Sequence, residues 1–277
     1  MPAQTATADE TSAEHSGSGR PGSGPLLAMR GVGKTFANGT VALENMSLKI
    51  DQGDFLSLLG PSGCGKSTAL RLISGLSQPT EGRLDWAGGA PAAGDIGFVF
   101  QEPTLMPWAT VFDNVWLPLR LKGQSKRQVR DAVMNALERV HLEDFAGSYP
   151  RELSGGMKMR VSIARALVVR PRILLMDEPY AALDEITRFK LNDDVLQLWS
   201  AFGLTVVFVT HSVFESVFLS DRIVIMAAKP GRVFAEMTID EPYPRSEAFR
   251  TSDTYAGLCR DVSGKLHEAM WGLEAPA

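Results

Sequence analysis

Cysteine and long apolar segments are both scarce in this chain. Its 277 residues include two cysteines, far apart, and no Cys/His cluster with the spacing of a metal site. Two distant cysteines form no disulfide framework and are typical of a reducing compartment. No stretch approaches the ~20 apolar residues of a membrane span, and no apolar core follows a basic start as in a secretory signal. We therefore expect a cytoplasmic protein that would meet a membrane only through a partner.

An excess of basic residues is also absent. The chain has 28 Lys and Arg against 32 Asp and Glu, a formal net charge of −4. This balance disfavours nucleic acid as a partner, although it does not exclude a local basic patch. Residues 1–25 have almost no large apolar side chain, so burial cannot offset their ordering entropy and we expect a disordered tail. With 44% hydrophobic residues, the chain as a whole can still fill a sizeable core.

The most informative stretch is GPSGCGKST at residues 60–68. Two glycines five residues apart precede Lys and Ser, which predicts a phosphate-binding loop. The apolar run at 54–59 suits a buried strand and residues 69–73 suit a helix, the context that such a loop requires. A glycine-rich turn that binds nothing is the alternative, and the later motifs disfavour it. The residues expected to contact nucleotide are Gly60, Pro61, Ser62, Gly63, Cys64, Gly65, Lys66, Ser67 and Thr68.

These residue types suit a triphosphate, which is a dense anion. Glycines let the backbone wrap the phosphates with N–H groups pointing inward at a helix N-terminus. Lys66 can reach the β- and γ-phosphates as a point charge, and the Ser67 hydroxyl can ligate Mg²⁺.

Polar side chains follow three further apolar runs. Gln101 follows the run at 96–100, Asp177 and Glu178 follow that at 172–176, and His211 follows that at 205–210. Unpaired buried acids are costly, so two at a strand end imply a cation or a reacting group nearby. A solvated helix cap is the alternative for the acids, and a structural role is the alternative for the histidine. Because ligands bind outside the carboxyl ends of parallel strands, we expect these side chains to converge on the phosphate loop.

Other segments complete a pattern of strands alternating with helices. Strands are expected near 27–32, 41–50, 82–86 and 222–227, with a turn at 37–40. Phe36 lies beside that turn, as either a core aromatic or a platform for a base. Residues 102–165 read as a helical insertion, where Ser125 and Gln128 form a capping box. The apolar stripe expected there is Val129, Ala132, Val133, Ala136, Leu137 and Val140.

The segment 241–277 follows the main domain at 26–240. Ser252 or Asp253 can cap a helix there. Its apolar stripe would be Tyr255, Leu258, Val262, Leu266 and Met270. We expect this helix to pack on its own domain, and a contact between two copies is the alternative.

Taken together, the motifs resemble the nucleotide-binding subunit of an ATP-binding cassette (ABC) transporter from residue 26 to about residue 239. The match rests on the phosphate loop, Gln101, the LSGG sequence at 153–156, the acid pair, the ALD sequence at 182–184 and the strand-end histidine. The resemblance implies an α/β fold of the P-loop NTPase type. Its mostly parallel sheet would carry an N-terminal antiparallel β part and the helical insertion.

The family comparison also implies a role for each site residue. ATP would lie between the phosphate loop of one subunit and the LSGG sequence of another in a head-to-tail homodimer. The roles implied near the metal are sensing of the metal and attacking water by Gln101, Mg²⁺ binding by Asp177 with Ser67, and polarisation of water by Glu178. Phe36 would stack on adenine, and His211 would contact the γ-phosphate. Ser154 and Gly156 would donate to the γ-phosphate in trans, Gly155 would belong to the same nucleotide-binding sequence, and Asp184 would couple the two sites across the dimer.

Three features depart from the usual family pattern. Met157 replaces a common Gln, Ser212 stands where acids are frequent, and residues 181–182 are both alanine where a serine-containing version is more usual. None of these removes a group assigned to catalysis. Met157, together with residues 99–103 and 106–108, is similar to the import subfamily for nitrate, sulfonate, taurine and pyrimidine precursors.

We therefore expect an ATP-hydrolysing subunit of an importer, bound to the cytoplasmic side of a membrane permease and served by a solute-binding protein. An exporter subunit is the nearer alternative. A soluble cassette ATPase acting on nucleic acid or ribosomes is disfavoured because the chain has one cassette and no heptad run. A non-hydrolysing regulator is disfavoured because Lys66, Glu178 and His211 are present. Residues 102–108 are expected to dock the permease, unless Trp108 packs in the core.

Overall fold

The computed structural model describes residues 25–272, so the tail expected at residues 1–25 lies outside them except for Pro25. The strands are β1 (Pro25–Thr35), β2 (Val41–Asp51), β3 (Phe55–Leu59), β4 (Glu81–Trp86), β5 (Ile96–Val99), β6 (Ile173–Asp177), β7 (Thr205–Thr210), β8 (Arg222–Ala227) and β9 (Arg232–Thr238). The helices are α1 (Lys66–Ile73), α2 (Val111–Leu121), α3 (Lys126–Glu138), α4 (Gly155–Leu167), α5 (Glu185–Phe202), α6 (Val213–Leu219), α7 (Glu247–Arg250) and α8 (Asp253–Trp271). Two short 3-10 turns, η1 (Glu143–Phe145) and η2 (Pro150–Glu152), lie between α3 and α4.

A six-stranded sheet forms the centre of the molecule, in the order β5-β6-β7-β3-β8-β9. The first five strands run parallel, and β9 pairs antiparallel with β8 at the edge. A separate antiparallel sheet, β2-β1-β4, comes from the N-terminal part of the chain. The expected α/β class is therefore confirmed, including the mostly parallel sheet and the antiparallel part.

Alternate residues of the central strands face two different cores. On β3, Leu56 and Leu58 pack with α1 and the small sheet, whereas Phe55 and Leu59 pack with the other helices. Every residue of β3 is buried, which explains why its sequence is a continuous apolar run. The central sheet is thus covered on both faces, and its carboxyl edge is left for the site.

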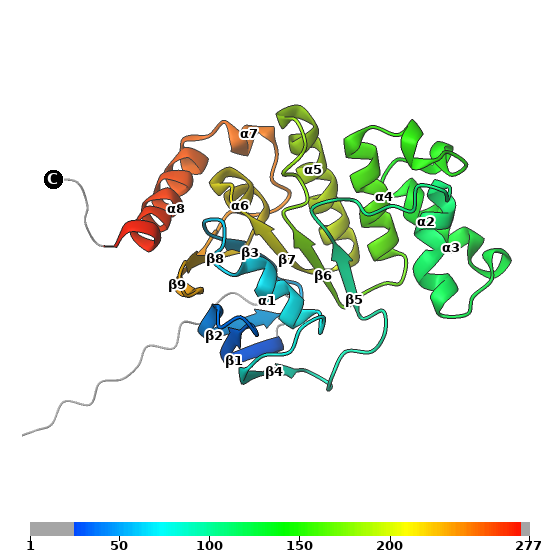
Figure 1. The fold of residues 1–277 in the computed structure, drawn as a ribbon. Helices are drawn as coiled ribbons and strands as arrows, with labels where there is room; N and C mark the ends of the chain where they lie inside the picture. The colour runs from blue at the N-terminus through cyan, green and yellow to red at the C-terminus, as the bar shows by residue number, and fades with distance from the viewer. Residues whose placement is uncertain (1–24, 273–277) are drawn as a thin grey trace, which may run out of the picture.

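Helices α2, α3 and α4 gather at the β5 end of the sheet, and α8 lies at the opposite end, near β8 and β9 (Figure 1). The capping box of Ser125 and Gln128 at the start of α3 is confirmed. Five residues of the predicted stripe are buried, but Ala132 is exposed. The prediction for Ala132 is wrong because the buried face of α3 is narrower than the run of apolar residues.

Helix α8 packs on its own domain. Ser252 caps it by accepting a hydrogen bond from the backbone N–H of Tyr255 at 3.1 Å. The Tyr255 hydroxyl donates to the carbonyl of Phe214 in α6 at 2.9 Å. Met270 is exposed, contrary to the predicted stripe, and Cys259, which that stripe did not include, is buried. The helix turns away from the core in its last turn. None of the helices within residues 25–272 combines the length and apolar character that a membrane span needs.

Candidate functional site

The phosphate loop connects β3 to α1 at the carboxyl edge of the central sheet. Gly65 caps α1 with a φ of +90°, and a Cβ there would lie 2.7 Å from the carbonyl oxygen of Ala42. Only glycine fits this left-handed and crowded position. The backbone is thus held in the wrapped form that presents N–H groups to an anion.

Lys66 is 4% exposed and lies inside this loop. Its Nζ donates to the carbonyl oxygens of Gly60 and Pro61, at 2.8 and 3.1 Å. The same nitrogen lies 3.5 Å from Oε1 of Glu178. The buried ammonium is therefore held inside the loop by two backbone carbonyl oxygens, which the oxygens of an incoming phosphate can replace.

Ser67 and Asp177 bring the start of α1 to the end of β6. The Ser67 hydroxyl donates to Asp177 Oδ1 at 2.8 Å. Burial raises the pKa of Asp177, and the Ser67 hydrogen bond partly opposes that rise. Within residues 25–272 no cluster of three or more His, Cys, Asp or Glu side chains could hold a metal ion alone. A hydroxyl and a carboxylate are nevertheless hard oxygen donors, and they suit Mg²⁺ that also takes phosphate oxygens.

Glu178 and His211 join the ends of β6 and β7. The Glu178 backbone N–H donates to the carbonyl of Val209 at 3.0 Å, and its φ of +46° is rare for a non-glycine residue. Glu178 Oε2 lies 3.3 Å from His211 Nδ1. The acid is therefore held between an ammonium and an imidazole, at the edge of an open cavity.

That cavity has a volume of about 500 Å³. Its lining includes Phe36, Ser62, Gly63, Gly65, Lys66, Ser67, Thr68, Gln101, Asp177 and Glu178. Phe36 is 41% exposed, so its interpretation as an ordinary core aromatic is wrong. The structure thus brings most of the sequence-predicted residues to one place.

The opposite wall of this cavity was not predicted from the sequence. Lys229 and Gly231, which follow β8, line it together with residues 40–42. Gly231 forms a bridge to Leu43, and a Cβ there would lie 2.2 Å from the carbonyl oxygen of Cys64. A lone glycine after a strand carries no sequence signal for a contact with a loop so far away in the chain.

Ser154, Gly155, Gly156 and Asp184 do not line this cavity. Ser154 caps α4 by accepting from the Met157 N–H. Asp184 caps α5, and the hydrogen bonds from Thr187 lower the pKa of its carboxyl. Gly156 lies against Thr187, where a Cβ would come within 2.6 Å of the threonine methyl. These two helix starts therefore form a second surface, separate from the phosphate loop.

The Cys64 side chain points into the protein and not into the cavity. It is fully buried, and this burial raises the pKa of its thiol. Because the thiolate is the reactive form, the structure makes Cys64 a packing residue of the loop.

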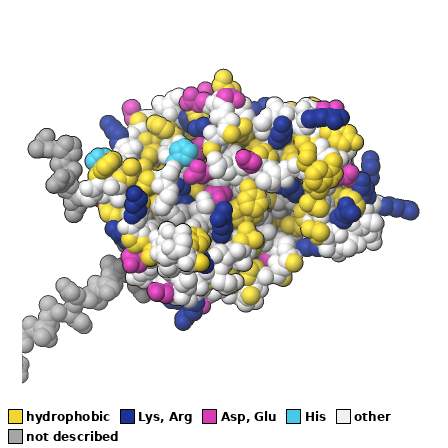
Figure 2. Space-filling model, viewed as in Figure 1, with side chains coloured by type: hydrophobic (Ala, Val, Ile, Leu, Met, Phe, Trp, Pro, Cys, Tyr) yellow, Lys and Arg dark blue, Asp and Glu magenta, His cyan; other side chains and the backbone are white. Residues whose placement is uncertain are grey.

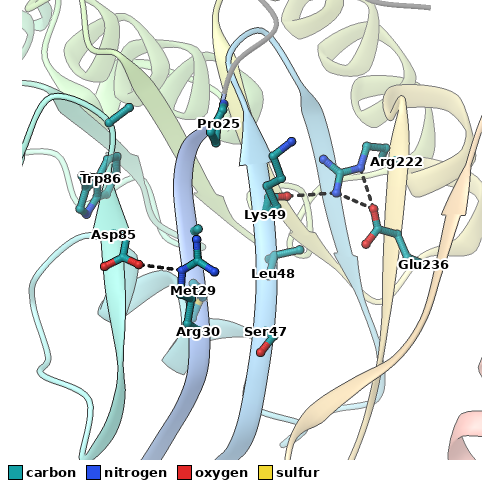
Figure 3. Close-up of a pocket in the computed structure, with 12 residues that line it drawn as sticks. Pro25, Met29, Arg30, Ser47, Leu48, Lys49, Asp85, Trp86, Arg222 and Glu236 are labelled. Atoms are coloured by element: carbon teal, nitrogen blue, oxygen red, sulfur yellow. Dashed lines mark hydrogen bonds and ion pairs between the residues drawn. The ribbon is translucent and has the colours of Figure 1, made fainter. Parts of the chain in front are cut away.

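A larger cavity, of about 680 Å³, lies beside the small sheet (Figure 3). Its charged groups already pair with one another: Arg30 with Asp85, and Arg222 with Glu236. Lys49 pairs with Asp51. A cavity whose charges are matched in this way offers little to a charged ligand, despite its size.

Comparison with known proteins agrees with this geometry. A family model described as ABC transporter matches residues 43–181. The chain is 42% identical to the aliphatic sulfonates import ATP-binding protein of Bacillus cereus over 241 residues, which cover 85% of this chain and 94% of the relative. The solved structure of cbiO1 from Clostridium perfringens, part of the ABC transporter complex cbiONQ, aligns with a TM-score of 0.72 and 27% identity over 88% of this chain and 99% of that chain. A dimeric ATP-binding cassette bound to ADP and Pi aligns with a TM-score of 0.68 and 36% identity, over 78% of this chain and 100% of that chain.

Proposed function

The chain belongs to the ABC transporter family as an ATP-binding subunit that hydrolyses ATP, and we propose that it drives the import of a small solute. The observation that carries this proposal is the meeting of Lys66, Ser67, Asp177 and Glu178 around one cavity, with His211 in contact with Glu178. The subunit would work as a homodimer on the cytoplasmic face of a membrane permease, and a solute-binding protein would deliver the solute.

We assign the binding steps to the phosphate loop. The loop N–H groups and Lys66 hold the β- and γ-phosphates, and Lys66 exchanges the carbonyls of Gly60 and Pro61 for phosphate oxygens. Phe36 stacks on the adenine from the rim of the cavity. Ser67, Asp177 and Gln101 would hold Mg²⁺, which when bound supplies positive charge to the phosphate oxygens.

The hydrolytic step is assigned to the groups at the ends of β6 and β7. Glu178 orients and polarises the attacking water, and His211 contacts the γ-phosphate. Phosphoryl transfer depends on positioning and charge stabilisation. A carboxylate held between Lys66 and His211 meets that need, because both of its oxygens already have a partner.

The dimer proposal follows from what the cavity lacks. Ser154 and Gly156 lie outside its lining, so donors from α4 would have to come from a second copy. The dimeric relative solved with ADP and Pi supports this arrangement. Asp184, on the loop before α5, would then couple the two sites across the dimer.

The permease is proposed to dock on a groove beside β5. This groove of about 500 Å³ is lined by Phe98, Phe100, Leu117, Leu121 and Ala166 among others. Figure 2, viewed as in Figure 1, shows several hydrophobic side chains exposed toward the end of the molecule where Figure 1 places α2, α3 and α4. Trp108 is 77% exposed, so its interpretation as a core residue is wrong. Exposed apolar groups of this kind favour a protein partner.

Import is favoured over export by the Bacillus cereus relative, whose name describes the import of aliphatic sulfonates. We infer a solute of the nitrate, sulfonate, taurine or pyrimidine-precursor class. An exporter remains the alternative function, and the presence of a solute-binding protein in the purified complex would argue against it.

The first experiment measures ATPase activity of the purified protein, alone and with its permease in a bilayer. Stimulation by the permease, and its loss in Glu178→Gln with ATP binding retained, is the expected result. A Glu178→Gln variant that turns over normally would remove this residue from its role. ATPase activity that is unchanged by a permease but is stimulated by ribosomes or DNA would contradict the transport proposal.

A further inference from the structure

A buried carboxylate that the proposed mechanism does not use lies directly behind the His211 loop. Glu215 in α6 is 7% exposed. Its Oε2 accepts a hydrogen bond from the Thr210 hydroxyl at 2.5 Å. The Thr210 oxygen in turn accepts from the backbone N–H of Ser212 at 2.9 Å. Burial raises the pKa of Glu215, so its charge needs a partner. The residues on both sides of His211 are thus tied to one acid.

The partner of Glu215 comes from a different helix. Arg188, in the first turn of α5, places Nε 3.4 Å from Glu215 Oε1. The same guanidinium donates through an Nη to the carbonyl of Leu183 at 3.2 Å. Leu183 immediately precedes Asp184, which caps α5. One planar group therefore contacts both the acid behind His211 and the loop that carries Asp184.

These contacts form a continuous connection between two loops, from Thr210 through Glu215 and Arg188 to Leu183. We propose that Arg188 and Glu215 are positioning residues that couple the position of the Asp184 loop to that of His211. The proposal rests on the dimer described above, in which the Asp184 loop meets the second copy. Closure of the dimer would then set His211 in place for hydrolysis.

The surroundings of the pair allow it to move. A cavity of about 280 Å³ borders both Arg188 and Glu215 and reaches Ser212. Asn192 also lines it, and the Asn192 Oδ1 atom is buried without a hydrogen-bond partner. A packed core resists small displacements. The Arg188 guanidinium, however, lies beside open space and near the unused Asn192 Oδ1 acceptor, so a second position is available to it. The pair can therefore shift when the Asp184 loop shifts.

The proposal is tested with Arg188→Met, Glu215→Gln and the double variant. Each is assayed for kcat, for the cooperativity of ATPase activity with ATP, and for ATP affinity by calorimetry. We expect each single variant to lower kcat by about ten- to a hundredfold, as misplaced catalytic groups do. ATP affinity should stay unchanged and cooperativity should be lost. The double variant should lose no more activity than either single variant, because both break one connection.

A matched control pair lies at the opposite edge of the sheet. Arg222 and Asp54 are similarly buried and 2.5 Å apart, but they contact neither loop. Asp54→Asn should lower the thermal midpoint while kcat stays at the wild-type value. If Arg188→Met does not fold, Arg188→Lys is assayed in its place. Lysine keeps the charge but has one nitrogen in place of the guanidinium, whose Nε pairs with Glu215 and whose Nη donates to the Leu183 carbonyl, so its kcat should also fall.

The outcomes separate this proposal from the proposed function. A folded Arg188→Lys or Glu215→Gln variant with wild-type kcat and cooperativity would overturn the coupling. Losses that simply multiply in the double variant would overturn it as well. If the wild type hydrolyses ATP cooperatively and Glu178→Gln loses ATPase activity, the proposed function stands even if the Arg188 and Glu215 variants contradict the coupling. Lack of dimerisation in the wild type would instead contradict the proposed function.

Discussion

Adding one methyl group at Gly231 should weaken ATP binding, although Gly231 lies far from the phosphate loop in the sequence. A Cβ there would lie 2.2 Å from the Cys64 carbonyl oxygen and 2.7 Å from that of Ala42. Both neighbours are backbone atoms, so no side-chain rotation relieves the contact. Carbon and oxygen approach comfortably only to about 3.3 Å. The loop must therefore retreat by about 1 Å.

The size of the effect follows from the donors that this retreat moves. Crowding of this kind costs about 1–3 kcal/mol of folding free energy. A hydrogen bond to a charged phosphate contributes about 1.5–3 kcal/mol, so losing one weakens ATP binding by about ten- to a hundredfold. We expect Gly231→Ala to show both changes.

Calorimetric titration with Mg-ATP measures the affinity, and urea denaturation measures the free energy of unfolding. Gly264→Ala in α8 is the matched control, because a Cβ at that position would meet nothing within 4 Å beyond its chain neighbours and the backbone of its own helix. That control should stabilise the protein by about 0.5–1 kcal/mol through helix propensity, with ATP affinity unchanged. Wild-type ATP affinity in Gly231→Ala would refute the inference that this strand end supports the phosphate loop.

Three further predictions concern the site itself. Lys66→Ala should weaken ATP binding in the same titration, because it removes the buried ammonium from the loop; wild-type affinity would contradict the assignment. Cys64 should react slowly with iodoacetamide in the folded protein, since its thiol is buried and its pKa is raised. The reaction rate, followed by mass spectrometry, should increase in the folded protein only at a more alkaline pH than a free thiol requires. Unfolding of the protein should also increase the rate. Mixing inactive Lys66→Ala with inactive Ser154→Arg should restore measurable ATPase activity, because mixed dimers contain one intact site; no recovery would argue against shared sites.

Much of the fold could be predicted because the sequence signals were local and strong. The buried runs of the parallel strands, the glycine loop and the cap at Ser252 each depend on residues close in sequence. The meeting of Ser67, Asp177 and His211 could also be predicted, since parallel strands end at one edge. The 2.8 Å between Ser67 and Asp177 and the 3.3 Å between Glu178 and His211 needed the structure.

The features that escaped prediction depend on contacts between distant segments. Nothing near Gly231 in the sequence indicates that the carbonyl of Cys64 will lie against it. Arg188 and Glu215 are 27 residues apart on two helices and are drawn together only because α5 and α6 pack. Ala132 and Met270 are exposed because the neighbouring core does not extend to them. A helical stripe in the sequence does not show where that core ends. Tertiary packing decided each of these positions.

The arrangement of charges explains why one chain should not hydrolyse ATP efficiently alone. Lys66, Asp177 and Glu178 line one side of an open cavity, and Ser154 and Asp184 cap helices outside it. Transition-state stabilisation needs donors on every side of the γ-phosphate and exclusion of water. A second copy presenting the start of α4 would supply both, and it would press on the Asp184 loop as it did so. Through Arg188 and Glu215, that same contact would reach His211, so completion of the site and readiness for hydrolysis would be one event.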